Sequence, residues 1–158
     1  MKKLMFAAMM LLGTSAAFAG DSNPLKAILS ATSYEQAVSL VQTNLSQLTD
    51  NAEKAKAYNK LYELAMGKVN AEQTIQLENQ TAQQMGKEGN KPVDEEGLYK
   101  ALDQVFDAAI EVNKYDNMPN AKGKVKPRYA RIIEPTYNLR SQLINGGIYF
   151  QGKKDDAN

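Results

Sequence analysis

Carboxylates are the side chains of this sequence that could carry catalysis. The chain has no Cys and no His, which excludes disulfides, thiolate or imidazole metal sites and a serine–histidine triad. Catalysis would instead need two carboxylates about 5–10 Å apart in one cleft, as in glycoside hydrolysis. Glu63 with Asp103 or Asp107 is a pair that a helical domain could bring together for hydrolytic or carbohydrate-active chemistry. No sequence motif supports such a site, and we predict a protein that is not an enzyme.

Adjacent acidic residues occur at Asp94-Glu95-Glu96. Neighbouring residues on a helix point in different directions, so these carboxylates are not expected to converge on a metal ion. At the start of a helix they would instead complement the positive end of its dipole. We predict no metal site and no cofactor.

A cluster of basic residues places five positive charges within ten residues: Lys122, Lys124, Lys126, Arg128 and Arg131. Such a patch could face an anionic membrane, an acidic partner or nucleic acid. A solvated loop that leads into a helix is the simpler interpretation. The net charge of the whole chain is only +1, which gives no global basic field. We therefore predict no nucleic-acid partner.

The first 19 residues have the pattern of a signal peptide. Lys2-Lys3 precedes an uncharged apolar run at 4–12, and Ala17-Phe18-Ala19 places small residues two apart. The run is shorter than the about 20 apolar residues that a membrane span needs. We predict cleavage after Ala19, export to the periplasm, the outer envelope or the medium, and no transmembrane anchor afterwards. Loss of Lys2 and Lys3 changes the net charge to −1.

These side chains must be positioned by helices, because apolar residues recur at helical spacing along residues 20–158. Ser33 with Gln36 and Asp50 with Glu53 are spaced as capping boxes. We expect a first helical pair over about 34–85. Residues 51–85 form either two helices or one helix that crosses Gly67. Gly86, Gly89 and Pro92 predict an exposed linker over about 86–94.

A second helical pair is expected over about 95–151. Its first helix has an apolar stripe made by Leu98, Leu102, Val105, Ala109 and Val112. A loop over about 114–126 follows, Pro127 suits a first helical position, and Pro135 either restarts or kinks the helix. Residues 147–150 could be read as a strand, but they are in phase with Leu139 and Leu143 and are predicted to be helical. The fold class is therefore all-α, a single domain of antiparallel helical pairs.

The last helix resembles the first helix of a tetratricopeptide repeat. Leu143, Gly147 and Phe150 match that family's bulky, small and aromatic positions. Gly146 stands where the family has a Leu. The order of elements over 34–158 is also similar to that of secreted bacterial proteins of this type. The resemblance implies a right-handed helical array that stops before the second helix of its last pair. Leu143, Gly147 and Phe150 would then be under-packed or folded back on earlier helices.

The resemblance also implies a non-enzymatic scaffold of the cell envelope that binds a protein or peptide. The polar stripe opposite the packing face could hydrogen-bond to the backbone of such a partner: Asn138, Gln142, Asn145 and Tyr149. An ordinary solvated helix face is the alternative for each of them. A structural accessory subunit of an envelope assembly is a further alternative function, beside the carboxylate-pair enzyme.

Overall fold

The computed structural model describes residues 20–155, and the regular secondary structure of these residues is helical, with no strand. The signal-peptide prediction for residues 1–19 lies outside them. The described helices are α1 (Asn23–Leu29), α2 (Tyr34–Asn44), α3 (Asn51–Gln84), α4 (Glu95–Asp116), α5 (Ile133–Asn138) and α6 (Arg140–Asp155), with short 3₁₀ helices at Leu45–Gln47 and Ala130–Ile132. The all-α prediction is confirmed.

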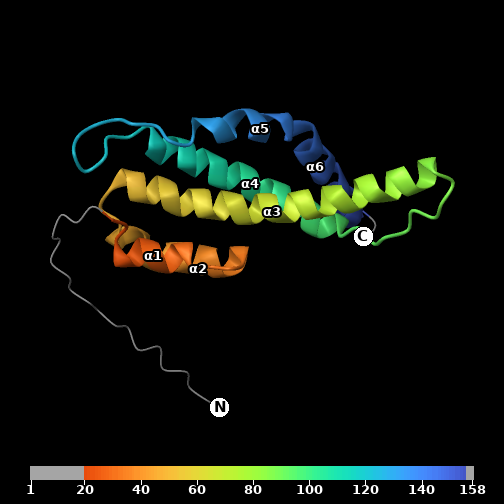
Figure 1. The fold of residues 1–158 in the computed structure, drawn as a ribbon, viewed down its shortest axis with the longest axis horizontal. Helices are drawn as coiled ribbons and strands as arrows, with labels where there is room; N and C mark the ends of the chain where they lie inside the picture. The colour runs from red at the N-terminus through yellow and green to blue at the C-terminus, as the bar shows by residue number, and fades with distance from the viewer. Residues whose placement is uncertain (1–19, 156–158) are drawn as a thin grey trace, which may run out of the picture.

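The longest element is α3, a single helix of 34 residues that lies antiparallel to α4 (Figure 1). Asp50 begins it, since its carboxylate accepts the Ala52 N–H at 2.9 Å. It ends at Gln84, and Gly86 follows the C-cap residue Met85 with a φ of +69°, which favours glycine. Gly67 costs a helix about 1 kcal/mol, and burial of Ala65 and Val69 on either side of it offsets that cost. Of the two sequence alternatives for residues 51–85, one continuous helix is therefore the correct one.

The short helix α1 was not expected from the sequence. Ser22 begins it by accepting the Leu25 N–H through its side chain, and Pro24 occupies the first turn. Leu25 and Ile28 are fully buried against the rest of the protein. Helices α1 and α2 lie side by side along one flank of α3 (Figure 1). A seven-residue helix is too short to show periodicity, but Ser22 and Pro24 are recognisable start signals.

One contiguous core forms where α1 and α2 pack on the α3–α4 pair. The largest fully buried side chains in it are Leu25, Ile28, Leu48, Val69, Leu102, Val105 and Val112. Buried alanines, among them Ala57, Ala65, Ala101 and Ala108, let the helices approach closely. The core is therefore built with few large apolar residues.

The connection from α4 to α5 differs from the prediction at Pro127. That residue lies outside any helix, and the next 3₁₀ helix begins at Ala130. The carboxylate of Asp116 accepts the N–H groups of Arg128 and Tyr129 at 2.8–3.0 Å, which holds both residues in a loop. Pro135 is the third residue of α5, where no helical N–H bond is lost, so it restarts the helix.

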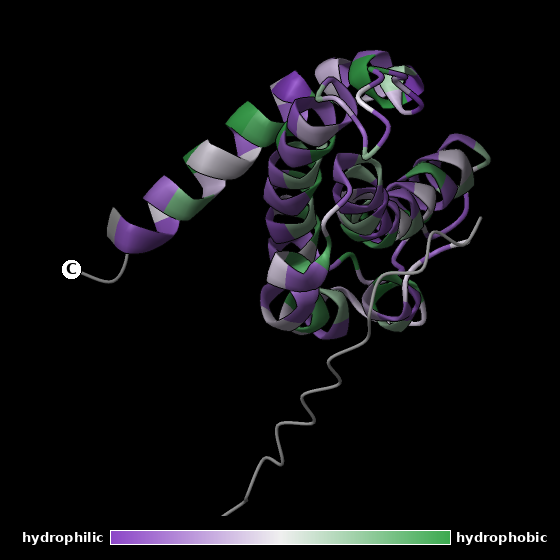
Figure 2. Cartoon of the chain, turned by 90° about the vertical axis from the view of Figure 1, so that its left-hand side faces the viewer, coloured by the Kyte–Doolittle hydropathy of each residue, from purple (hydrophilic) through white to green (hydrophobic). Residues whose placement is uncertain are grey.

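Helix α6 extends away from the bundle toward its C-terminal end (Figure 2). Residues 147–150 are helical, as predicted. The packing glycine, however, is Gly146 and not Gly147. A Cβ at Gly146 would lie 2.9 Å from Cδ1 of Tyr99, whereas Gly147 is exposed with open space around it. Leu143 folds back on the core, as expected, and is half-buried there.

Candidate functional site

The predicted polar stripe on α5 and α6 does not form one open face. The side-chain oxygen of Gln142 accepts from Nε2 of Gln73 on α3 at 2.8 Å. Tyr149 packs on Tyr99 of α4, with 5.1 Å between ring centroids. Asn138 and Asn145 are exposed. Two of the four predicted partner-binding residues therefore contact α3 or α4, and the other two are exposed.

The outer face of α5 and α6 exposes large apolar side chains instead. The exposed fractions are 50% for Ile133, 61% for Tyr137 and 63% for both Ile144 and Ile148. On each helix the two residues are four apart, so they lie on one side of it. Apolar side chains gathered in this way mark interaction sites more often than single exposed residues do. We call these four exposed residues, one pair on each helix, the outer apolar face: Ile133, Tyr137, Ile144 and Ile148.

Sequence reasoning missed the outer apolar face because it assigned apolar residues to the packing stripe. Ile144 directly follows Leu143 of that stripe, and Ile148 directly follows Gly147. The spacing of four between two isoleucines was an available signal. What was not available is which side of α6 meets the bundle, since Tyr99 and Gln73 lie far away in the sequence.

The inner face of α6 is held on α4 by a charged contact as well as by aromatic packing. Nζ of Lys153 lies 2.8 Å from a carboxylate oxygen of Glu96 and 4.8 Å from the ring centroid of Tyr149. Lys100 and Lys153 both hydrogen-bond to Glu96, which lowers its pKa to about 2. Glu96 also raises the pKa of Lys153. The contact adds to the aromatic packing that joins α6 to α4.

The five residues of the predicted basic patch lie between α4 and α5. Four of them are on the connection that follows α4, and Arg131 is in the 3₁₀ helix that precedes α5. All five are exposed: Lys122, Lys124, Lys126, Arg128 and Arg131. Within residues 20–155 none of them forms an ion pair. The loop is nevertheless tied to the bundle, because Asn51 donates to the carbonyl of Pro119 and Asp50 accepts the Ala121 N–H.

The proposed carboxylate pair is not brought together at a cavity. Asp103 and Asp107 are one turn apart on α4 near Tyr34, whose pKa is raised by burial and by their charges. Burial and the charge of Asp103 raise the pKa of Asp107. Glu63 on α3 instead accepts a hydrogen bond from Asn59 at 2.8 Å. Neither the cavity between α4 and the start of α5 nor the hollow beside Lys124 has Glu63, Asp103 or Asp107 in its lining.

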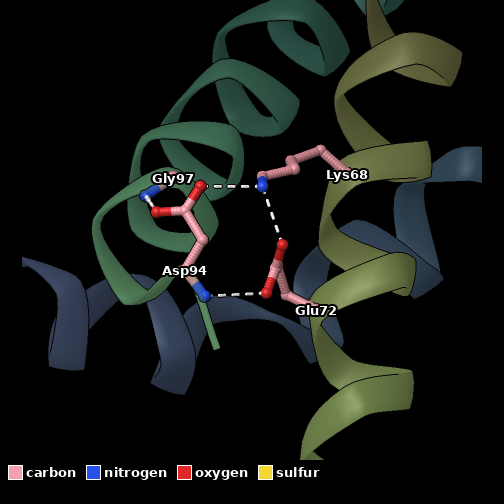
Figure 3. Close-up of polar contacts among 4 residues, drawn as sticks. All are labelled: Lys68, Glu72, Asp94 and Gly97. Carbon is pink, nitrogen blue, oxygen red and sulfur yellow. Dashed lines mark hydrogen bonds and ion pairs between the residues drawn. The ribbon is translucent and has the colours of Figure 1, made fainter. Parts of the chain in front are cut away.

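The most connected charged cluster is Lys68, Glu72 and Asp94 (Figure 3). Nζ of Lys68 lies 2.7 Å from Glu72 and 2.8 Å from Asp94. Glu72 accepts the Asp94 N–H at 2.9 Å, and Asp94 accepts the Gly97 N–H at 2.9 Å. Lys68 lowers the pKa of both carboxyl groups, and they raise its own. Lys68 and two backbone N–H groups therefore pair with both carboxylates, and the cluster begins α4 and holds the connection that precedes α4.

That connection is held along α3 at a second point. The side chain of Asn79 both donates to the carbonyl of Lys91 and accepts its N–H, at 2.8 and 2.9 Å. Residues 86–94 are not helical, as predicted, but they follow α3 closely and are not a free linker. A Cβ at Gly89 would overlap the backbone of Asn79.

The larger cavity lies between α4 and the start of α5 and measures about 170 Å³. Val112, Asp116, Tyr129 and Ile132 are among its lining residues. Small-molecule sites usually measure about 300–1,000 Å³, and the Asp116 carboxylate is already occupied by backbone N–H groups. Among residues 20–155 no group of three or more acidic side chains could hold a metal ion.

Comparisons with protein-family models, curated proteins and solved structures find no match. Function must therefore be inferred from the surface itself. In the described part of the chain, no helix combines the length and the apolar character needed to cross a membrane. The outer apolar face is a described surface whose exposed apolar side chains the packing of the fold does not require.

Proposed function

We propose that the chain is a non-enzymatic scaffold of the cell envelope that binds a protein or peptide through the outer apolar face. The observation that carries this proposal is the 63% exposure of both Ile144 and Ile148 on one side of α6. Burying a large aliphatic side chain in a partner is favourable by about 1.5–3 kcal/mol. Residues four apart on a helix are the usual anchors when a helix packs into a partner's groove.

The attachment of α6 to the bundle supports the same proposal. Gln73, Tyr99 and Glu96 contact the inner face of α6, so its outer face is presented on an ordered helix. A partner would not have to supply the free energy for folding α6, and this lowers the cost of association. Asn145 is exposed beside Ile144 and can hydrogen-bond to a partner at the rim.

The proposed architecture is a helical array like that of tetratricopeptide-repeat proteins. The α1–α2 and α3–α4 neighbours, joined by short connections, support it. One difference is the length of α3, since its 34 residues equal a whole tetratricopeptide repeat without the turn between two helices. Such an array would bind through the exposed side of its last pair.

The proposed location follows from the signal-peptide pattern of residues 1–19. An exported chain that starts at Gly20 would support it, as read by mass spectrometry of the protein recovered from the producing bacterium. An intact chain that stays in the cytoplasm would contradict the location but not the binding face.

Binding is tested by a double substitution on α6, Ile144→Ser with Ile148→Ser. The matched control is Leu77→Ser with Ile110→Ser, since those residues are also 63% exposed but lie on α3 and α4. Each purified protein is used to capture partners from envelope extracts. We expect a stoichiometric partner with the unsubstituted chain and the control, and its loss with the α6 variant.

Stability should not explain that loss. Both double variants remove exposed side chains, so the free energy of unfolding should change by no more than about 1 kcal/mol in each. Equal capture by the α6 variant, or equal loss with both variants, would contradict binding through the outer apolar face.

A further inference from the structure

The basic residues between α4 and α5 form a cluster without a nearby carboxylate partner, unlike six lysines elsewhere in the described chain. Between Asp116 and Glu134 the sequence has five basic residues and no acidic one. All five are exposed, and none forms an ion pair within the described residues. Elsewhere, six lysines are ion-paired with carboxylates: Lys56, Lys68, Lys91, Lys100, Lys114 and Lys153. The positive charge of this loop is therefore not neutralised by an ion pair within the described residues and is available to a binding partner.

The loop is ordered before anything binds to it. The side-chain oxygen of Asn120 accepts the N–H groups of Lys122 and Lys124 at 2.9 and 3.1 Å. Gly123, with a φ of +70°, donates to the carbonyl of Asn120 at 2.8 Å. Asp116 holds the other end through the N–H groups of Arg128 and Tyr129. The cations are thus carried on a preformed turn, so binding would not have to order the backbone.

The shape of the loop suits a flat surface better than a shaped ligand. It protrudes at one end of the molecule (Figure 1), and the hollow lined by Lys124, Lys126 and Arg128 measures only about 10 Å³. Val125 is 51% exposed among these cations. Anionic lipid headgroups attract clustered Lys and Arg without a fitted cavity, and an apolar side chain can enter the interface beside them.

We propose that the loop from Lys122 to Arg131 docks the protein onto an anionic lipid surface. The positive charge of the loop is complementary to such a surface. Three of the five cations are lysines, whose ammonium groups act as point charges and do not need the paired hydrogen bonds that an arginine guanidinium forms. Each Lys or Arg near the surface strengthens binding by about fivefold. The outer apolar face uses other residues, so the two proposals can fail separately.

The test compares vesicles of phosphatidylcholine with vesicles of phosphatidylcholine and phosphatidylglycerol, by co-sedimentation at low and high salt. The loop variant is Lys122→Gln, Lys124→Gln and Lys126→Gln. The matched control is Lys26→Gln, Lys60→Gln and Lys87→Gln, which removes the same charge from lysines without an ion pair in the described chain. All three proteins are full-length chains, so residues 1–19 contribute equally to each.

The quantity that decides is the preference for anionic over neutral vesicles. We expect the loop variant to lose about a hundredfold of that preference, the control to keep most of it, and salt to weaken binding of the unsubstituted chain. Equal preference in the loop variant and the control would overturn the proposal. So would binding to soluble polyglutamate without binding to anionic vesicles, because that result assigns the loop to an acidic protein partner.

Discussion

The α3–α4 pair and the α5–α6 segment use their apolar residues in opposite ways. On α4, Leu98, Leu102 and Val105 are at most 2% exposed. On α6, the buried residue among 140–154 is Gly146, while Ile144 and Ile148 are 63% exposed. The first region gains stability from its side chains, and the second presents its side chains to solvent. The residues that stabilise the core and those of the proposed binding face therefore lie in separate parts of the chain and can be substituted separately.

The largest expected effect is a cavity in the core. Leu102→Ala removes a fully buried side chain, so we expect a loss of about 2–5 kcal/mol in the free energy of unfolding. Leu143→Ala on α6 removes a half-buried one and should cost less, about 1 kcal/mol. Urea unfolding followed by circular dichroism measures both. Equal losses would mean that α6 contributes to the core as much as α4 does.

A smaller effect on the free energy of unfolding is expected from substitutions at Gly146 and Gly147 of α6, and its sign should differ between the two positions. Gly146→Ala places a Cβ 2.9 Å from the Tyr99 ring, and such overpacking typically costs about 1–3 kcal/mol. Gly147→Ala meets open space and should stabilise the helix by about 0.5–1 kcal/mol. Thermal unfolding and hydrogen exchange of the α6 amides report the difference. A stabilising Gly146→Ala would show that α6 does not pack closely on α4.

The smallest effect is a pH dependence of the contact between α6 and α4. The folded-state pKa of Glu96, about 2, lies below its ordinary value of 4.5 because Lys100 and Lys153 favour the ionised form. The contact is therefore complete above about pH 4.5 and is lost as the pH falls through about 2. Exchange of the α6 amides should accelerate over that range relative to those of α3.

A matched pair of variants separates this contact from general acid effects. Glu96→Gln should accelerate exchange in α6 at neutral pH, because both ion pairs are lost. Glu95→Gln changes an exposed neighbour that has no ion pair in the described chain and should have no such effect. Identical exchange in the two variants would show that Lys153 does not help to hold α6.

The helix positions were largely predictable because periodicity and caps are local. Ser33 accepts the Gln36 N–H, and Asp50 begins α3, both as the sequence indicates. In each expected capping box, the predicted hydrogen bond from the backbone N–H of the first residue back to the Gln or Glu side chain was wrong. Gln36 accepts the N–H of Thr32, and Glu53 accepts the N–H and hydroxyl of Ser22, which lies 31 residues earlier. A tertiary partner competes for the side chain in the second case, and local spacing does not reveal such a partner.

The candidate binding face was only partly predictable for the same reason. The sequence indicates that α6 is a helix with a packing side, and Leu143 is on that side. The side is shifted by one residue from the expected one, because Tyr99 fills the space over Gly146 and Gln73 reaches Gln142. A shift of one residue turns a helix by about 100°. It is enough to exchange the predicted polar face for the outer apolar face.

The length of the unbroken α3 also sets the distance between the two ends of this helix. A helix of 34 residues is about 50 Å long, at 1.5 Å per residue. Asn51 at its first turn holds Pro119 of the basic loop, whereas Met85 and Gly86 lie at its other end. The length of α3 thus sets how far its C-terminal end can lie from the loop. When the loop rests on a surface, the far end of α3 can stand up to about 50 Å away from it, and fluorescent labels at Lys122 and Met85 could read that span directly.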